Sequence, residues 1–299
     1  MTVDGGPTLP ADGGRTLAIC VAHPDDESYS TYGTVALHRH DPRFRLVVLH
    51  ATDGEGGQVA AGVPLSPDGL GAQRRREDDA AWRAVGREPA RHDWLGYRDG
   101  HLAEVPHDQL VRQVAAFLDE ERPDVVVTFG PDGITGHPDH VAIGAATDEA
   151  FHRVRGGAGG GLKRLLHCAI RESLFERHQQ WRTRHGRDRW DPTALYHLRG
   201  TPDALIGVDV DTRSVAPLIV AGLKEHATQR AVIFDPTGSE ADWERYAKRE
   251  FHVRAWPPRT DAVVFADVFE GLGTPECARQ GDHLMPDQPF GGWAQPNAR

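Results

Sequence analysis

The chain has 299 residues, which is enough to bury a full hydrophobic core as one large domain or two small ones. It carries 34 Lys and Arg against 44 Asp and Glu, and the formal net charge of −10 disfavours a surface built to bind nucleic-acid phosphates. The 3 cysteines lie far apart and form no CxxC pair, so neither a disulfide framework nor a thiolate zinc site is indicated.

The sequence shows no targeting signal and no linker long enough to separate two domains. No stretch approaches the ~18 consecutive apolar residues of a membrane-spanning helix, and the N-terminus lacks the basic start and apolar segment of a signal peptide. We therefore expect a soluble cytoplasmic protein that does not bind a membrane. Glycine and proline punctuation predicts a flexible leader over 1–15, one domain over 16–275 and an extended tail over 276–299. A homo-oligomer is compatible with this composition, which does not determine the oligomeric state.

Strand-like and helix-like segments alternate through the first half of the chain. Short apolar, β-branched runs predict strands over 16–23, 44–54, 91–100 (the weakest) and 124–133. Helix-like segments lie between them, over 28–38, 74–85 and 107–123. Continuous apolar runs suit strands that are covered on both faces. This order predicts an α/β fold with right-handed crossovers: a Rossmann-like, doubly wound, mostly parallel sheet with helices on both faces.

The second half is predicted to continue the same domain with insertions. It contains apolar segments at 163–170, 204–210 and 261–272 and a predicted helix over 215–233. Between them lies an Arg- and Trp-rich segment, 171–190, where we expect substrate identity to reside. Arginine pairs with phosphate and aromatic rings stack on sugars, so the segment could contact an anionic or sugar substrate, although a solvated, flexible insertion is favoured.

Polar clusters follow each predicted strand of the first half, at the position where sheets of this kind bind ligands. HPDDE places His23, Asp25 and Asp26 after the first strand, and GHPDH places His137 and His140 after a later one. The two segments are expected to meet at the carboxyl edge of the sheet. Imidazoles and carboxylates are good zinc ligands, and a catalytic zinc usually has three protein ligands and one open position. A bound cation would also neutralise the crowded acids.

A purely structural role is the alternative for these residues. Asp25 or Asp26 could cap a helix that begins near Ser28, and HP or DD pairs are common in turns. Two such segments, each directly after a strand and each with His or Asp side chains at ligand spacing, favour the metal site. The residues alone do not decide whether His137 or His140 is the ligand.

Together, AHPDDE and GHPDH resemble the PIG-L or LmbE-like family of zinc-dependent N-deacetylases, most strongly over the first half of the chain. The resemblance implies a zinc cofactor, with another divalent metal such as Fe²⁺ as the alternative. By position it makes His23, Asp26 and His140 the metal ligands. It makes Asp25 the general base that deprotonates a metal-activated water, and His137 the group that stabilises or protonates the tetrahedral intermediate.

The same resemblance implies substrate contacts. Arg74 opens a helix in the family's frame and would bind substrate hydroxyls, while Asp99, in LGYRDGHL, would accept two sugar hydroxyls. The glycine- and proline-rich segment 51–73 suggests a mobile loop over the site, and an ordinary surface loop is the alternative. Several side chains are left open between a role in the site and a structural one, with packing favoured for the last three: Glu27, Asp53, Lys224, His226 and Gln229.

The sequence therefore predicts a metal-dependent hydrolase that removes an N-acetyl or similar N-acyl group from a small-molecule amino sugar or glycoconjugate. One rival is an amidase of the same fold that acts on a larger thiol or natural-product conjugate, for which loop 51–73 and the second-half insertion must leave room. The other rival is a non-catalytic metal- or sugar-binding protein. Asp25 disfavours that rival, because a binding site does not need a second acid beside its ligand.

Overall fold

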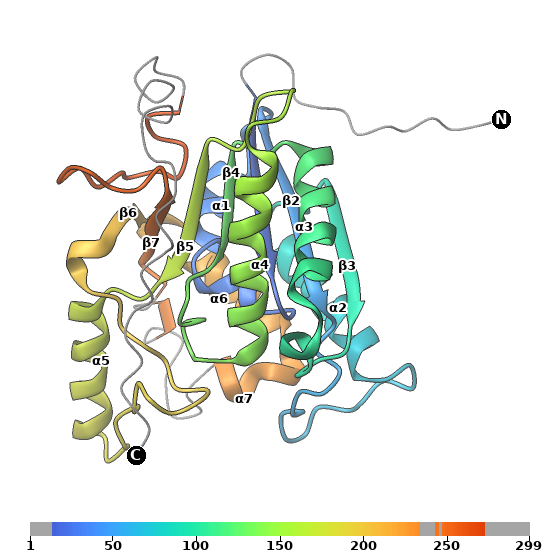
Figure 1. Cartoon of the computed structure of the whole chain (residues 1–299). Helices are drawn as coiled ribbons and strands as arrows, with labels where there is room; N and C mark the ends of the chain where they lie inside the picture. The colour runs from blue at the N-terminus through green and yellow to red at the C-terminus, as the bar shows by residue number, and fades with distance from the viewer. Residues whose placement is uncertain (1–13, 234–242, 245–246, 273–299) are drawn as a thin grey trace, which may run out of the picture.

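The computed structural model describes residues 14–233, 243–244 and 247–272 (Figure 1). Within these residues, seven strands form one sheet in the order β3-β2-β1-β4-β5-β7-β6. The first five strands along the chain are parallel: β1 (Arg15–Val21), β2 (Phe44–Thr52), β3 (Arg91–Tyr97), β4 (Val125–Phe129) and β5 (Arg164–Ala169). The predicted mostly parallel sheet is confirmed.

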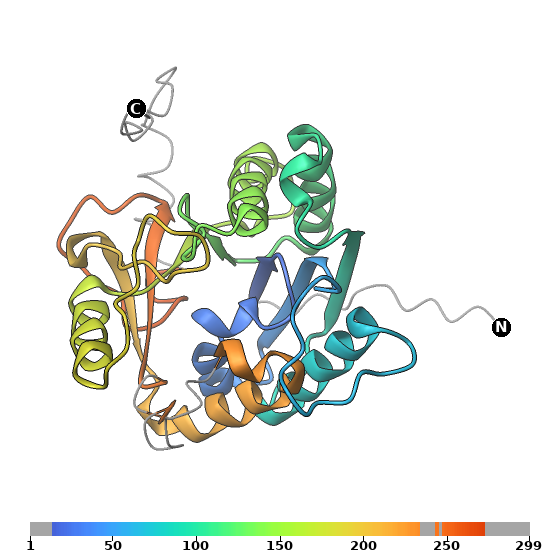
Figure 2. The same cartoon turned by 90° about the horizontal axis from the view of Figure 1, so that it is seen from below.

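Helices cover both faces of this sheet (Figure 2). On one face lie α3 (His107–Glu121) and α4 (Pro138–Val154), and on the other lie α1 (Tyr32–His38), α2 (Leu70–Val85) and α6 (Ala216–Glu225). The buried stripe of α3 is the one that its apolar spacing predicts: Leu110, Val111, Val114, Ala115, Phe117 and Leu118. The predicted doubly wound α/β fold is therefore confirmed, although α2 begins at Leu70 rather than at Arg74.

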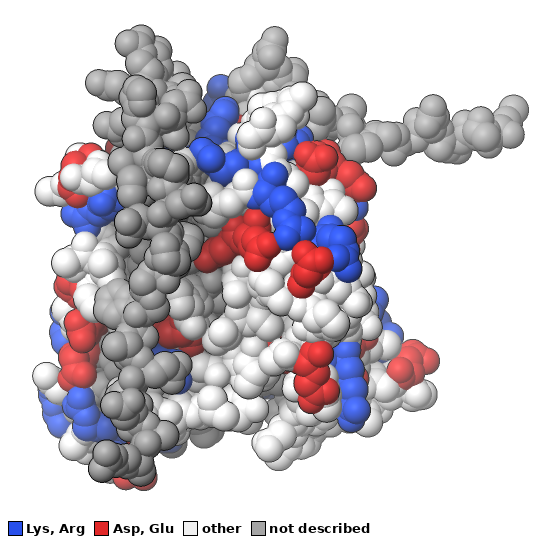
Figure 3. Space-filling model, viewed as in Figure 1, with Lys and Arg blue, Asp and Glu red and all other residues white. Residues whose placement is uncertain are grey.

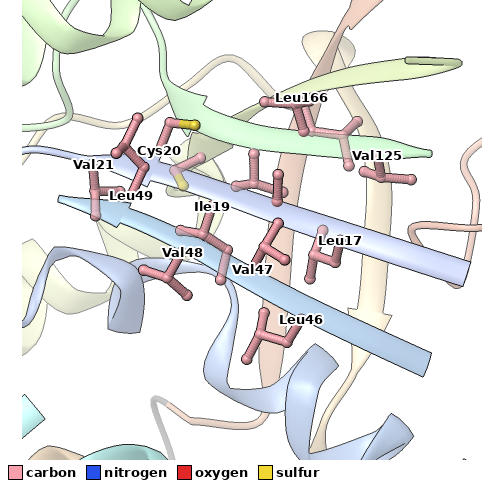
Figure 4. Packing of buried hydrophobic residues seen from close by; sticks show 14 of the residues in the cluster. Leu17, Ile19, Cys20, Val21, Leu46, Val47, Val48, Leu49, Val125 and Leu166 are labelled. Atoms are coloured by element: carbon pink, nitrogen blue, oxygen red, sulfur yellow. The ribbon is translucent and has the colours of Figure 1, made fainter. Parts of the chain in front are cut away.

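The central strands are buried on both faces, which explains their continuous apolar sequences. Every residue of β2 is buried, and in β1 only Arg15 is not. In the register of these two strands Leu17 lies beside Leu46 and Ile19 beside Val48 (Figure 4). Full burial of each such side chain contributes about 1.5–3 kcal/mol. This packing gives the loops that leave the strands a rigid base.

The sheet has one strand that the sequence did not predict. β7 (Arg249–Trp256) runs antiparallel to its two neighbours, β5 and β6 (Ile206–Asp211). Two of its charged residues, Glu250 and Arg254, conceal the strand, because charged residues are expected to face solvent but these two are buried. Glu250, for example, accepts hydrogen bonds from the backbone N–H groups of Gly33 and Thr34 at the start of α1.

Two predicted helices are interrupted in the structure. The helix predicted over 28–38 is divided into a 3₁₀ turn, Asp26–Tyr29, and α1. The helix predicted over 215–233 breaks at His226, after which α6 is followed by a 3₁₀ turn and the short α7 (Arg230–Ile233). At this break the imidazole of His226 is buried and lies 2.8 Å from the Tyr32 hydroxyl.

The Arg- and Trp-rich segment forms α5 (Glu172–Arg184) and a following loop beside β6 and β7 (Figure 1). Several of its side chains contact one another. Phe175 stacks with Trp190 at 6.0 Å between ring centroids, and the guanidinium of Arg182 lies 4.2 Å from the centroid of the same ring. These rings and charges pack within the segment itself.

Charges of both signs lie side by side on the face that carries α3 and α4 (Figure 3). Arg153 of α4 is 3.2 Å from Asp108 of α3 and 2.6 Å from Glu149 of its own helix. Among the described residues, no helix is long and apolar enough to span a bilayer. Nearly all of the predicted leader and all of the predicted tail lie outside the described residues, so the domain boundaries stay predictions.

Candidate active site and metal centre

The candidate site lies where the strand order of the sheet reverses. β1 and β4 are neighbours, but β2 and β3 extend from β1 on one side while β5 extends from β4 on the other. Ligands of doubly wound sheets bind at the carboxyl ends of two such strands. The loop after β1 carries His23, Asp25 and Asp26, and the loop after β4 carries His137 and leads to His140 at the start of α4.

Three of these side chains converge on one point. His23 Nδ1 lies 3.1 Å from Asp26 Oδ2, and His140 Nε2 lies 3.0 Å from Asp26 Oδ1. The two imidazole nitrogens are 3.3 Å apart. All three residues are buried, and their ligand atoms lie within 4.8 Å of one another. The structure thus brings together the three residues that were predicted to hold a metal.

A hydrogen bond on the far side of the His140 ring fixes which nitrogen faces this centre. His140 Nδ1 lies 2.9 Å from the carbonyl oxygen of Gly133, which can only accept, so Nδ1 carries the proton and Nε2 presents a lone pair. That lone pair faces an oxygen of Asp26, and the two repel unless a proton or a cation lies between them. Histidine ligands of metals commonly donate their outer N–H in this way, so the donor set fits a divalent metal.

His23 is surrounded by carboxylates. Its Nε2 lies 3.0 Å from Asp99 Oδ1 and 3.4 Å from Asp139 Oδ2, while its Nδ1 faces Asp26. Burial disfavours a charged ring, but these acids outweigh burial and raise the pKa of His23 well above its ordinary value. Burial likewise disfavours a charged Asp26, yet His140 and His23 hold its pKa well below the ordinary value. The cluster therefore favours a positive charge at its centre.

His23 also belongs to a second group of possible ligands, with His137 and Asp139. That group suits a metal less well, because its other members are already engaged. Asp139 accepts the backbone N–H groups of Gly100 at 2.8 Å and Leu102 at 3.0 Å, and His137 Nδ1 accepts the N–H of Asp139 at 3.1 Å. The group of His23 with Asp26 and His140 is therefore the better candidate for a metal centre.

Asp25 and Asp26 differ in what their side chains do. The Asp26 carboxylate turns back and accepts the backbone N–H of His23 at 2.7 Å, while Asp25, at the capping position of the 3₁₀ turn, makes no side-chain capping hydrogen bond. The alternative that these acids serve to cap a helix near Ser28 is therefore wrong. Asp25 instead has a φ of 100°, which is uncommon for a residue with a side chain.

The unusual backbone of Asp25 is held from several sides. Its N–H donates to Glu27 Oε2 at 3.0 Å, and its carbonyl oxygen accepts from the backbone and hydroxyl of Ser28. Its side chain is 17% exposed, against 4% for Asp26, and lies 3.4 Å from the Arg74 guanidinium. Burial raises the pKa of Asp25 to about 6, although Arg74 acts in the opposite direction. Asp25 is therefore the less enclosed acid of the pair.

Glu27 is the centre of a buried network beneath this loop. One of its oxygens accepts from the Tyr32 hydroxyl at 2.7 Å and faces His226 Nε2 at 3.3 Å. The other accepts the Asp25 N–H and faces His50 Nε2 at 3.2 Å. These contacts are those of a residue that positions the loop rather than those of a helix cap.

Arg74 lies under the loop rather than at the surface. It is buried, and its guanidinium donates to the carbonyl oxygens of Pro24 and Gly54 as well as pairing with Asp25. Gly54 has a φ of 67°, and a Cβ there would come within 2.1 Å of the guanidinium, so this close approach requires glycine. Arg74 thus shapes the loop after β1. Its binding of substrate hydroxyls stays a prediction.

Asp99 reaches the cluster from the loop after β3, although β2 separates β3 from β1. Its carboxylate faces His23 and accepts the backbone N–H of Gly56 at 3.1 Å. Asp139, which the sequence did not single out, ties the same loop to α4 through Gly100 and Leu102. The one signal for Asp139 was its place between two candidate ligands in GHPDH. That Asp99 binds sugar hydroxyls stays a prediction.

His137 stands at the start of α4, on the more exposed side of the cluster. Because its Nδ1 accepts the N–H of Asp139, the neutral ring carries its proton on Nε2. The ring centroid lies 4.7 Å from that of His23 and 4.8 Å from that of His140. Burial and these two neighbouring imidazoles lower the pKa of His137 to about 4, so the ring is neutral at neutral pH.

Tyr196, which the sequence did not indicate, lies against His137. The two rings meet edge to face with centroids 5.2 Å apart. Tyr196 is 65% exposed and has a φ of 64°. Backbone hydrogen bonds from Tyr196 to Thr135 and from Arg199 to Ile134 tie its segment to the loop after β4. An exposed aromatic ring held beside the site offers a surface on which a substrate can pack.

Two of the residues whose roles were left open make structural contacts. Gln229 donates to the carbonyl oxygen of Gln58 at 3.1 Å, which ties the loop between β2 and α2 to the segment after α6. Lys224 lies 5.9 Å from the ring centroid of Trp243. Both contacts agree with the favoured packing role.

The fold and the site define an α/β protein with a candidate metal centre at the carboxyl edge of a doubly wound sheet. A family model described as PIG-L, GlcNAc-PI de-N-acetylase, matches residues 18–151. A 1D-myo-inositol 2-acetamido-2-deoxy-alpha-D-glucopyranoside deacetylase of Saccharomonospora viridis is 30% identical over 274 residues, which cover 84% of this chain and 98% of the relative. The chain belongs to the PIG-L family of de-N-acetylases, as its two motifs predicted.

Two solved structures share the fold at low sequence identity. The N,N'-diacetylchitobiose deacetylase of Pyrococcus horikoshii gives a TM-score of 0.53 at 19% identity, covering 83% of this chain and 86% of that one. The 4-carboxy-2-hydroxymuconate hydratase of Pseudomonas putida gives 0.56 at 17% identity, covering 83% and 98%. One is a deacetylase and the other a hydratase, so the fold alone does not determine the reaction.

If the cluster binds a divalent metal, replacing Asp139 with Asn is expected to weaken the binding of added zinc about 10- to 100-fold, because the change removes a charge that orients His23 and loosens the loop after β3. The zinc dissociation constant can be measured by competition with a chromogenic chelator. Asp148→Asn is the matched control, since Asp148 lies on the same helix but pairs with His167 at 2.8 Å. Equal zinc affinities in the two variants would contradict the role of Asp139.

Proposed function

We propose that the protein removes the acetyl group from the 2-acetamido nitrogen of a small molecule that contains N-acetylglucosamine, and that it does so with a divalent metal held by His23, Asp26 and His140. The observation that carries this proposal is Asp25. This acid is kept in an unusual backbone conformation beside three buried ligands, and its described contacts are with Arg74 and the loop around it. A site that only bound metal would not need it.

The donor set supports zinc as the first choice of metal. Two imidazole nitrogens and one carboxylate oxygen are the ligands of many catalytic zinc sites, and they leave a position for substrate or water. Fe²⁺ takes the same ligand types and is the alternative. A bound divalent cation would polarise an acyl carbonyl group and make water at the site easier to deprotonate.

Asp25 is the general base and then the general acid in this proposal. With a pKa of about 6 it is largely ionised at neutral pH, so it can take a proton from the attacking water. Glu27, Ser28 and Arg74 hold it in place while it does so. Once protonated, Asp25 can deliver that proton to the departing nitrogen, which leaves the sugar as an amine and the acyl group as acetate.

In this proposal His137 stabilises the oxyanion and does not protonate the amine. Both roles were compatible with the family resemblance. The hydrogen bond from the Asp139 N–H to Nδ1 favours the first, because the neutral ring then points its one proton outward from Nε2. If the neutral ring gave up that proton, an imidazolate anion would remain beside two buried acids.

A sugar substrate is supported by the relatives and by the groups around the cluster. The Saccharomonospora viridis relative is named as the deacetylase of an inositol glycoside, and the Pyrococcus horikoshii enzyme as a deacetylase of N,N'-diacetylchitobiose. In this chain Asp99 places a carboxylate next to His23, and Tyr196 places an exposed ring next to His137. The two sides of the cluster thus offer a hydroxyl acceptor and a stacking surface.

Asp25→Asn is expected to lower acetate release from N-acetylglucosaminyl-inositol by about 10²- to 10⁴-fold while the protein keeps its metal, because Asn has the same shape but cannot accept the proton. His140→Ala is the matched variant and is expected to lose activity together with the metal of this site. Acetate is measured by a coupled assay and metal by emission spectrometry. Full turnover by Asp25→Asn would contradict the mechanism. If no N-acetylated sugar gave chelator-sensitive acetate release, the proposed function would be wrong.

Tyr196→Ala is expected to raise KM about five- to tenfold with little change in kcat, because a ring that packs against the bound substrate contributes about 1 kcal/mol. Tyr196→Phe should behave like the wild type. The control is Leu205→Ala, an exposed apolar residue in the turn before β6. An unchanged KM would contradict the substrate contact, and a loss confined to kcat would assign Tyr196 to positioning His137 instead.

A further inference from the structure

A second cluster of ligand-type side chains lies next to Glu27. His50 is on β2, His92 is on β3 and Asp78 is on α2. His50 Nδ1 and His92 Nε2 are 2.9 Å apart, and His92 Nε2 is 3.3 Å from Asp78 Oδ2. The three residues offer ligand atoms that all lie within 4.8 Å of one another. The sequence did not indicate this cluster, because its members come from three separate elements.

Each imidazole of the cluster has a carboxylate near its outer nitrogen. His50 Nε2 lies within hydrogen-bond distance of Glu27 Oε2, at 3.2 Å, whereas His92 Nδ1 lies 3.9 Å from Asp79 Oδ1, which is too far for a hydrogen bond. An ionised carboxylate only accepts hydrogen bonds, so it favours the tautomer whose proton points outward and whose inner nitrogen carries a lone pair. Histidine ligands of metals commonly have such an outer partner. The inner nitrogens, His50 Nδ1 and His92 Nε2, are 2.9 Å apart, so either a proton shared between them or a bound cation must lie there.

Asp78 supplies the strongest indication that something is bound here. It is 0% exposed, and apart from the 3.3 Å contact between Oδ2 and His92 Nε2 its oxygens have no hydrogen-bond partner among the described residues. A buried carboxylate without a donor is costly, and a second acid, Glu27, lies close to it. Arg75, one turn earlier on α2, does not compensate for this charge, because it pairs with Asp53 at 3.1 Å and lies over the ring of Trp94 at 4.6 Å.

We propose that His50, Asp78 and His92 form a second site for a divalent cation, with zinc as the expected metal. Two imidazole nitrogens and one carboxylate oxygen are zinc ligands, and a cation among them would pair the Asp78 carboxylate. The Trp94 ring stacks on both imidazoles, with centroids 4.5 and 4.8 Å away. A cation bound here would join β2, β3 and α2.

The second site would also support the first. His50 holds Glu27, and Glu27 in turn accepts the N–H of Asp25. A cation at the second site would therefore fix the base of the loop that presents the general base. The site itself is independent of the proposed function, since it would bind its metal whatever reaction the protein catalyses.

The test is the zinc content of the untagged full chain after metal removal, zinc addition and desalting. We expect about two zinc ions per wild-type chain. Each of the single variants His140→Ala, Asp78→Asn and His92→Gln should hold about one. The double variant His140→Ala with Asp78→Asn should hold almost none. His107→Gln is the matched control and should hold as much zinc as the wild type, because His107 is at the surface, where it pairs with Glu149 at 2.9 Å.

A zinc content of one ion per wild-type chain would overturn the proposal. So would the absence of zinc from His140→Ala, or a zinc content of two ions per chain in both Asp78→Asn and His92→Gln. His140→Ala keeps the test decisive if the other variants do not fold. Its Tm is a second readout: added zinc should raise it, because the remaining site binds only the folded chain, and no shift contradicts the proposal. Two bound zinc ions without acetate release would refute the proposed function and leave this site standing.

Discussion

The crowding of carboxylates around His23 is the constraint on which the candidate site depends. Asp26, Asp99 and Asp139 each lie within 3.4 Å of one of its ring nitrogens, and His23, Asp26 and Asp139 are buried. Buried charges of one sign persist only where a positive partner compensates them. A cation held by His23, Asp26 and His140 would supply that partner, and it would leave Asp25 as the acid that is free to move a proton.

The rest of the fold serves to hold this crowded edge in place. The reversal of strand order between β1 and β4 brings the two motif loops together. Asp139 adds the loop after β3, while Glu27 and Arg74 fix the backbone and side chain of Asp25. Glu27 also contacts His50, so the candidate active site and the second cluster share one buried network. The general base is therefore positioned by contacts that reach well beyond its own loop.

Much of the fold and the five motif residues could be predicted because their signals are local. The central strands are covered on both faces and so are apolar throughout, and HPDDE and GHPDH follow two of them directly. β7 escaped prediction because Glu250 and Arg254 are charged yet buried against distant parts of the chain. Asp139, Tyr196 and Asp78 escaped for the same reason: their roles depend on partners in other elements, which spacing along the sequence does not reveal.

Zinc-edge anomalous diffraction from crystals of the zinc-loaded protein tests the central claim most directly. We expect a peak about 2.0–2.2 Å from His23 Nδ1, from an oxygen of Asp26 and from His140 Nε2, with Asp25 outside the coordination shell. The absence of a peak among these three side chains would contradict the assignment of the metal centre. A peak that Asp25 ligates would contradict its assignment as the general base.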